Sequence, residues 1–314
     1  MSLTSRLNDS KSPVRRFLSE QFPHTRSVIR ECRNTITNAE TIRPTMPVPW
    51  STLGIALDYR LRYYFGLTPA RDLVAWAGAK RVSDDDIWED VGIGSYAIKA
   101  RPNEPSLPRT AIESFFQELD EVLPELRPAG RQLDRQQEET LSRYCIVLAL
   151  FEEVSRAGPH RESPLFSGEA TTTTSELLAI PETHWIDDLC SLSSLFYERF
   201  CKVLAEPVVL NPTFEGSRDV GVADGDFILN NCLIDIKAMI NPAVTNVMLY
   251  QLLGYVLLDY SNQYQINGVG VYFARQGVLL QWSLQDLPIS LSNGAVPPLQ
   301  ELREQFRLVA QPAS

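Results

Sequence analysis

The pair Asn230-Asn231 constrains the fold of this chain more than any other feature, because it separates two apolar runs, VGVADGDFIL and CLIDIKAM. Asparagine tolerates the positive φ that both central residues of a tight two-residue turn require. The two runs are therefore predicted to pair as an antiparallel β-hairpin, with Leu229 facing Cys232 across the turn.

Counting outward from that turn places four charged residues at opposed positions on the two strands. Asp226 is expected opposite Asp235, and Asp224 is expected opposite Lys237. Directly opposed residues share a face of a sheet, as do residues two apart on one strand. All four groups are therefore predicted to meet on one patch, where the carboxylates repel unless protonation, the lysine or a bound cation offsets their charge.

A bound divalent cation is the interpretation that fits this patch best. Carboxylate oxygens are ligands of the kind that Mg²⁺ and Mn²⁺ prefer, and such an ion can polarise a scissile phosphate and activate a water molecule. Lys237 would orient that water or stabilise developing charge. The alternative is a solvated face of an edge hairpin, in which Lys237 simply pairs with an aspartate. A central hairpin is favoured by the apolar neighbours of the patch, which are Phe227, Leu233, Ile234 and Ile236.

The segments around the hairpin have their own periodicity. An amphipathic helix is predicted over THWIDDLCSLSSLFYERFCKVLA, and PVVLNPTF is predicted to be a further strand. A helix capped near Asn241-Pro242 is predicted to contain VTNVMLYQLLGYVLLDY, which is apolar on nearly every face. GVGVYFARQGVLLQWSL is predicted to form a hairpin that turns at residues 275–277. The expected order is thus helix, three strands, helix and two strands.

The remainder of the chain up to about residue 158 has helical spacing, and residues 158–174 are rich in Gly, Pro, Ser and Thr. We therefore predict a mainly helical region over residues 1–175 and an α/β (α+β) core over residues 176–314. Within the helical region, the arginines and tyrosines of DYRLRYYF have two interpretations. They either line a nucleic-acid groove or form a core helix whose tyrosines pack and whose arginines reach the surface.

The charge of the chain is unfavourable for nucleic-acid binding as a whole, because the formal net charge is −10. Positive charge is nevertheless concentrated in residues 1–45, which hold one Lys and seven Arg against four acidic residues. Clustered charge matters more than the total for binding a polyanion. An amino-terminal segment that is merely solvated is an equally acceptable interpretation.

Several classes of protein are disfavoured by what the sequence lacks. No stretch approaches the roughly 20 apolar residues of a membrane span, and the first residues do not resemble a secretory signal, so a cytoplasmic protein is expected. The five cysteines are scattered, which suggests neither disulfides nor a zinc site. There is no GxxxxGK[ST] loop, so any nucleotide-driven translocation would come from a helicase or ATPase partner.

Three motifs of the predicted core resemble the PD-(D/E)xK nuclease superfamily, and more narrowly its RecB-like branch. Asp235-Ile236-Lys237 looks like the (D/E)xK element, residues 221–224 (GVAD) look like the GxxD element, and Gln251 with Tyr255 looks like the QxxxY helix. The resemblance covers residues 184–282. It implies a restriction-endonuclease-like core, with a central mixed β-sheet flanked by helices.

The resemblance also implies a chemistry, which is Mg²⁺-dependent (or Mn²⁺-dependent) hydrolysis of phosphodiester bonds. Asp224, Asp235 and Asp226 would be the metal ligands, and Lys237 would be the catalytic lysine. Gln251 is implied to support the site. A polar side chain in so apolar a helix is also expected to have a buried partner, because an unpaired amide costs about 1 to 3 kcal/mol. For Tyr255, simple core packing is the competing interpretation.

A further acid often comes from the preceding helix in this family, and Glu198 is the candidate as both metal ligand and catalytic residue. The alternative for Glu198 is a solvent-facing glutamate that pairs with Arg199 or Lys202. Asp58 is a second candidate, because the GIALD segment is similar to a GxxxH helix element of RecB-like enzymes. This sequence has aspartate where those enzymes carry histidine.

The leading functional hypothesis is therefore a metal-dependent deoxyribonuclease, in a context such as bacterial phage defence or DNA repair. The alternative is a catalytically inactive scaffold or nucleic-acid-binding protein that keeps the PD-(D/E)xK fold and works within a larger complex. A third hypothesis, a nuclease that acts on RNA, differs only in substrate, and nothing in the sequence is suited to read a 2′-hydroxyl.

Overall fold

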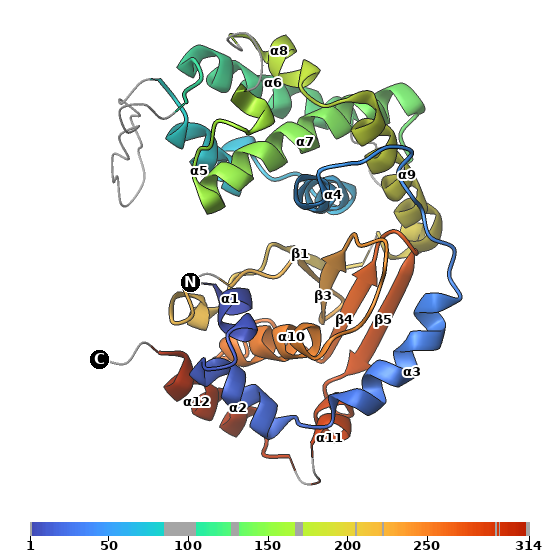
Figure 1. Ribbon diagram of the computed structural model, residues 1–314, viewed down its shortest axis with the longest axis vertical. Helices are drawn as coiled ribbons and strands as arrows, with labels where there is room; N and C mark the ends of the chain where they lie inside the picture. The colour runs from blue at the N-terminus through green and yellow to red at the C-terminus, as the bar shows by residue number, and fades with distance from the viewer. Residues whose placement is uncertain are drawn as a thin grey trace. The chain divides into compact units, whose positions relative to one another are not determined.

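The computed structural model describes residues 2–84, 105–126, 132–166, 172–204, 206–221, 223–292, 294 and 296–311. The chain divides into two compact units, one formed by Met1–Ile42 with Glu206–Ser314 and the other by Arg43–Ala205 (Figure 1). This division differs from the boundary predicted near residue 175. The first helices of the chain join the α/β unit because their apolar faces are buried in its core.

The α/β unit is built on one five-stranded mixed sheet, ordered β1-β2-β3-β4-β5. The central pair, β3 and β4, is parallel, and every other neighbouring pair is antiparallel. A parallel pair needs a crossover connection, which α10 (Asn246–Leu258) provides. The strands are β1 (Val208–Leu210), β2 (Phe227–Leu229), β3 (Cys232–Lys237), β4 (Gly268–Phe273) and β5 (Val278–Ser283).

The hairpin predicted around Asn230-Asn231 is confirmed. The two asparagines have φ values of 48° and 61°, and Leu229 pairs with Cys232. The cap predicted for the following helix is displaced, because α10 begins at Asn246 and the Thr245 side chain accepts the hydrogen bond at its start. The tight turn thus fixes the register of β2 on β3, and with it the face on which each side chain lies.

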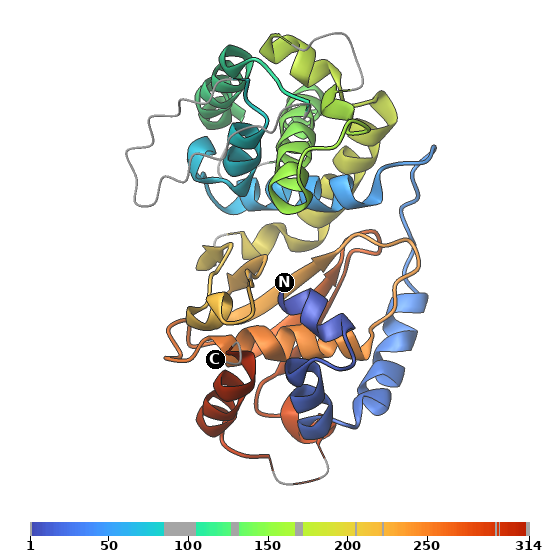
Figure 2. The same cartoon turned by 60° about the vertical axis from the view of Figure 1, so that its left-hand side comes forward.

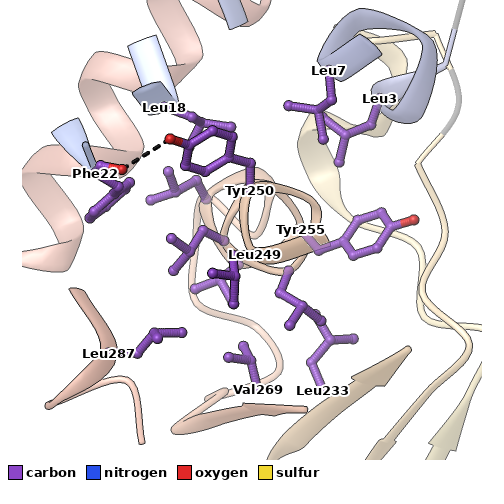
Figure 3. Close-up of a cluster of buried hydrophobic side chains, with 14 of the residues drawn as sticks. Leu3, Leu7, Leu18, Phe22, Leu233, Leu249, Tyr250, Tyr255, Val269 and Leu287 are labelled. Carbon is purple, nitrogen blue, oxygen red and sulfur yellow. Dashed lines mark hydrogen bonds between the residues drawn. The ribbon is translucent and has the colours of Figure 1, made fainter. Parts of the chain in front are cut away.

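The helix α10 is the centre of the hydrophobic core. Every residue of its segment 248–258 is buried, as its apolar sequence predicts. On one side it packs on the sheet, and on the other it is covered by α1 (Leu3–Asn8) and α2 (Pro13–Gln21), as Figures 2 and 3 show. The hydroxyl group of Tyr250 donates to the carbonyl oxygen of Phe22 at 3.0 Å, which fastens the end of α2 to this helix.

Three further helices complete the α/β unit. They are α3 (Thr25–Thr37), α11 (Leu287–Leu291) and α12 (Leu299–Ala310). The helix α3 contacts α11, α10 and the edge strand β5, and α12 packs on α10 and α2. A one-turn 3₁₀ helix, η4 (Glu215–Arg218), lies between β1 and β2.

The Arg43–Ala205 unit is helical in its described part. Its helices are α4 (Trp50–Phe65), α5 (Val74–Arg81), α6 (Arg109–Leu126), α7 (Arg135–Ala157), α8 (Thr174–Ala179) and α9 (Thr183–Phe200), with short 3₁₀ turns η1 (Ala70–Asp72), η2 (Pro164–Phe166) and η3 (Cys201–Val203). No helix among the described residues is long and apolar enough to cross a membrane.

The structure decides between the two interpretations of DYRLRYYF. Tyr59, Arg60 and Tyr64 of α4 are buried. The guanidinium group of Arg60 donates two hydrogen bonds of 2.7 Å to the carboxylate of Glu138, and it lies 3.9 Å from the centre of the Tyr64 ring. This segment is therefore a core helix, but the expectation that its arginines reach the surface is wrong for Arg60, which is buried with its partner Glu138.

Replacement by alanine is expected to have opposite effects on stability at two glycines of the helical unit. A Cβ atom on Gly78 of α5 would lie 1.7 Å from the carbonyl oxygen of Phe151 in α7, whereas one on Gly54 of α4 would have nothing within 4 Å. Gly78→Ala should lower the free energy of unfolding by about 1 to 3 kcal/mol or more, because the helices must separate. Gly54→Ala should raise it by about 0.5 to 1 kcal/mol. Urea denaturation followed by circular dichroism measures both, and shifts in the same direction would contradict this packing.

Candidate active site

The candidate site lies at the carboxyl end of the central strand β3, on the face of the sheet that α10 covers. Asp235 and Lys237 are two residues apart on β3 and share this face with Leu233, which belongs to the core under α10. Their partners on β4, Val271 and Phe273, also belong to this core. The sheet therefore holds a pair of charged groups at the margin of a hydrophobic layer.

Asp235 and Lys237 form a buried ion pair. The Asp235 side chain is 8% exposed, and Lys237 Nζ lies 2.6 Å from Asp235 Oδ2. Burial alone would lower the pKa of Lys237, but the Asp235 and Asp226 carboxylates outweigh it, so this pKa is raised and the lysine stays charged at neutral pH. Among the described residues, Oδ2 accepts no hydrogen bond of good geometry, although the ammonium group is close. The ammonium group of Lys237 is therefore the cation that offsets the charge of this buried oxygen.

Asp226 is held against β3 by its side chain and not by a strand pairing. The β2–β3 ladder ends at Phe227 and Ile234, one residue short of the expected Asp226–Asp235 pair. Instead, the Asp226 carboxylate accepts a 2.6 Å hydrogen bond from the backbone N–H of Ile236. Such charge-assisted bonds are stronger than neutral ones, so Asp226 is fixed beside both members of the ion pair.

The segment that carries Asp224 pairs with the chain after β1, which corrects the predicted pairing of Asp224 with Lys237. Asp224 forms an isolated antiparallel bridge with Thr213, and the N–H of Gly225 donates to the carbonyl oxygen of Pro212 at 3.0 Å. The ladder on β3 ends at Phe227 and Ile234 and does not extend to residues 224–226. Within the GxxD element, Val222 lies outside the described residues.

The three carboxylates all act electrostatically on one group, the hydroxyl group of Tyr255. Burial is the largest cause that raises the pKa of Tyr255, and the charges of Asp235, Asp226 and Asp224 each raise it further. Contacts place Asp235 beside Lys237 and Asp226 beside β3, and the meeting of Asp224 with them on one face stays a prediction.

Gln251 and Tyr255 connect this cluster to α10. Gln251 is buried, and its Nε2 donates to the Tyr255 hydroxyl oxygen at 2.9 Å and to Thr4 Oγ1 of α1 at 3.4 Å. The expectation that Gln251 has a buried partner is confirmed. The Tyr255 ring also stacks on Phe214, with the ring centres 5.6 Å apart, so this residue packs in the core and presents its hydroxyl group away from it (Figure 3).

Two side chains of the turn between β4 and β5 hold the backbone that follows β3, which the sequence did not reveal. Arg275 is fully buried, and its Nε donates to the carbonyl oxygen of Ala238, the residue after Lys237, at 2.9 Å. Gln276 Nε2 donates to the carbonyl oxygens of Met239 and Ile240 at 3.3 and 3.4 Å. An arginine and a glutamine between two apolar strands were the only signal, and they were interpreted as ordinary turn residues.

The two candidates for a further acid belong to the helical unit. Glu198 is an exposed residue of α9, and Asp58 is a residue of α4 whose carboxylate accepts a 3.0 Å hydrogen bond from Arg62 Nε one turn later. Burial raises the pKa of Asp58, and the charge of Arg62 opposes that effect. The α/β unit that holds Asp235 contains neither residue, so a role for either one in the site stays a prediction.

The acidic residues of the candidate site meet the ligand needs of zinc and of magnesium to different degrees. Among the described residues, no group of three or more His, Cys, Asp or Glu side chains is arranged to hold a metal ion. Zinc needs such a group, because its sites use three or four protein ligands. Magnesium usually binds through one or two carboxylates and completes its shell with water and phosphate oxygens. The carboxylates of Asp224 and Asp235 are ligands of the chemical type that Mg²⁺ or Mn²⁺ prefers, and their use for such an ion stays a prediction.

Comparison of this chain with protein-family models, with curated proteins and with solved structures finds no match.

The ion pair leads us to expect different stabilities for a single and a double variant. Lys237→Met should lower the free energy of unfolding by about 3 kcal/mol, because it leaves the Asp235 carboxylate buried without its cation. The double variant Asp235→Asn/Lys237→Met should recover more than half of that loss, since no buried charge remains uncompensated. Exposed Lys11 provides the control, and Lys11→Met should change stability by less than about 0.5 kcal/mol. Equal losses in the single and double variants, measured by urea denaturation, would refute this account of the ion pair.

Proposed function

We propose that the α/β unit is a Mg²⁺-dependent phosphodiesterase that cleaves DNA, with a restriction-endonuclease-like core. The observation that carries the proposal is the ion pair of Asp235 and Lys237 on the sheet face under α10, with the Asp226 carboxylate held beside it by the N–H of Ile236. The arrangement of three antiparallel strands, a crossover helix and a parallel strand supports it, because the resemblance to PD-(D/E)xK nucleases implies this order.

In this proposal Asp224 and Asp235 would hold the ion, which would supply charge stabilisation at a scissile phosphate and lower the pKa of a bound water. Lys237 orients that water or stabilises developing negative charge, and its raised pKa keeps it cationic while it does so. Asp226 contributes the negative charge that, with Asp235, maintains this protonation state. The site thus combines acids that bind a cation with a lysine that those acids keep charged.

Tyr255 has a more limited role in the same proposal. Its raised pKa keeps the hydroxyl group protonated at neutral pH, so it can donate a hydrogen bond but cannot act as a general base. Gln251 donates to the hydroxyl oxygen and thereby leaves the hydroxyl proton to point elsewhere. We therefore assign Gln251 as a positioning residue and Tyr255 as a hydrogen-bond donor toward the carboxylates or a bound phosphate.

The partners follow from the same chemistry. A DNA strand supplies the phosphate oxygens that complete the coordination of magnesium. A helicase or ATPase partner would supply directed movement along DNA, since the sequence has no phosphate-binding loop of its own. Cytoplasmic location, and a role in phage defence or repair, belong to the same proposal.

One observation favours the alternative of an inactive scaffold. The Lys237 ammonium group already neutralises Asp235 at 2.6 Å, and the described residues contain no three-ligand metal group. A protein that kept this fold for binding alone could retain the ion pair for stability. The two functions differ in whether hydrolysis depends on these residues and on a divalent ion.

The test is incubation of the purified full-length protein with supercoiled, linear and single-stranded DNA and with RNA, in Mg²⁺, Mn²⁺ or EDTA. We expect cleavage of DNA that needs the divalent ion and that falls by at least about 100-fold in Asp235→Ala and in Lys237→Ala. Tyr255→Phe should have a smaller effect. Exposed Asp286 of the same unit serves as the control, and Asp286→Ala should cleave like wild type.

Three outcomes would decide against the proposal. Wild type and all variants could leave every substrate intact, which supports the scaffold. Cleavage could persist in folded Asp235→Ala and Lys237→Ala, which places the chemistry elsewhere. Cleavage of RNA alone would show that the substrate is RNA and not DNA, and the site would remain as proposed. Glu198→Ala and Asp58→Asn extend the test, because a strong loss in one of them identifies the further acid.

A further inference from the structure

The helix α3 presents three exposed arginines on one side. Arg26, Arg30 and Arg33 are spaced i, i+4 and i+7, which places them in a single stripe along the helix. The buried residues of α3 lie on its other side and hold it against the α/β unit. The stripe is therefore a fixed feature of a packed helix.

None of these arginines is neutralised within the described part of the protein. Their guanidinium groups take part in no hydrogen bond or ion pair there. No acidic residue stands three or four positions from any of them, and their neighbours at those spacings include one another. Like charges at these spacings repel on a helix surface. This is unusual in a chain with 39 acidic and 29 basic residues, where acidic partners are abundant.

The helix end adds to the unfavourable charge. Arg26 lies in the first turn of α3, which contains no acidic residue. The amino-terminal end of a helix carries partial positive charge, so a cation there is disfavoured. Repulsion within the stripe and at the helix end would both be relieved by a bound polyanion.

The dimensions and position of the stripe suit a nucleic-acid backbone. Arg26 and Arg33 are seven residues apart, a rise of about 10 Å, which corresponds to roughly three base-pair rises along the axis of a duplex. The α3 helix contacts β5 at the edge of the sheet (Figure 1). Beyond its carboxyl end, Ile42 donates to the carbonyl oxygen of Arg275 at 2.8 Å, and Arg275 supports the residue after Lys237. The chain thus leads from the stripe to the end of β3 that carries the site.

We propose that Arg26, Arg30 and Arg33 form a phosphate-contacting surface that holds the DNA backbone beside the candidate site. This inference rests on the proposed function for its choice of DNA as the polyanion. Contacts to phosphate carry no base information, so the surface binds DNA without regard to sequence. It explains how a chain of net charge −10 would attract DNA, because the positive charge is gathered on one exposed helix face.

The test measures binding separately from cleavage. Fluorescent duplex DNA, single-stranded DNA and RNA are titrated with the full-length protein in EDTA over a series of salt concentrations. In the variant Arg26→Ala/Arg30→Ala/Arg33→Ala, the slope of log affinity against log salt should become shallower by about 2 to 3 for duplex DNA. Its thermal midpoint should be unchanged or slightly higher, since alanine favours helices and the repulsion is gone.

The control removes the same charge from scattered positions. Arg71→Ala/Arg199→Ala/Arg307→Ala changes exposed arginines of η1, α9 and α12, and its slope should change by less than about 1. The proposal is overturned if wild type binds no DNA, if the stripe variant binds like wild type, or if the control loses as much as the stripe variant. A change of slope with RNA and none with DNA overturns the assignment to DNA.

A parallel cleavage assay in Mg²⁺ separates this inference from the proposed function. If wild type cleaves DNA and the stripe variant binds it normally, the surface is refuted and the nuclease stands. If the stripe variant loses binding while wild type does not cleave, the nuclease is refuted and the surface stands.

Discussion

The buried carboxylate of Asp235 is the group on which the rest of the α/β unit depends. A charge at the margin of a hydrophobic core is costly unless another charge offsets it, and Lys237 does so at 2.6 Å. Asp226, held by the N–H of Ile236, adds a second carboxylate to the same lysine. Pairing with β4 holds both charged residues of β3, and Arg275 and Gln276 hold the loop that follows the strand. The packing of the sheet and the chemistry proposed for it therefore rest on the same few contacts.

The sequence predicted those features that depend on local periodicity. The turn at Asn230-Asn231, the register that follows from it and the buried helix α10 could all be read from neighbouring residues. The buried partner of Gln251 could be expected from the cost of an unpaired amide, although Thr4 could not be named. These are properties of one or two segments, and periodicity describes such segments well.

Features that join distant segments were missed for the same reason. Residues 224–226 pair with residues 211–213, and the ladder on β3 ends before them, which no count from the turn could show. Helices from the first 42 residues enter the core of the last part of the chain, so the division into units is not one cut in the sequence. Arg6 shows how closely the parts are joined, because it donates to the carbonyl oxygens of Ala310 and Asp219 at 2.8 Å each.

We propose that Asp224 and Asp235 form a cation site, and that Lys237 partly balances the charge of these carboxylates. Binding of Mn²⁺, followed by electron paramagnetic resonance without any nucleic acid, tests it directly. The account predicts saturable binding to wild type that Asp235→Asn abolishes while the protein stays folded, and that Asp286→Asn leaves unchanged. Wild type without saturable binding, or equal binding in wild type and folded Asp235→Asn, would contradict it.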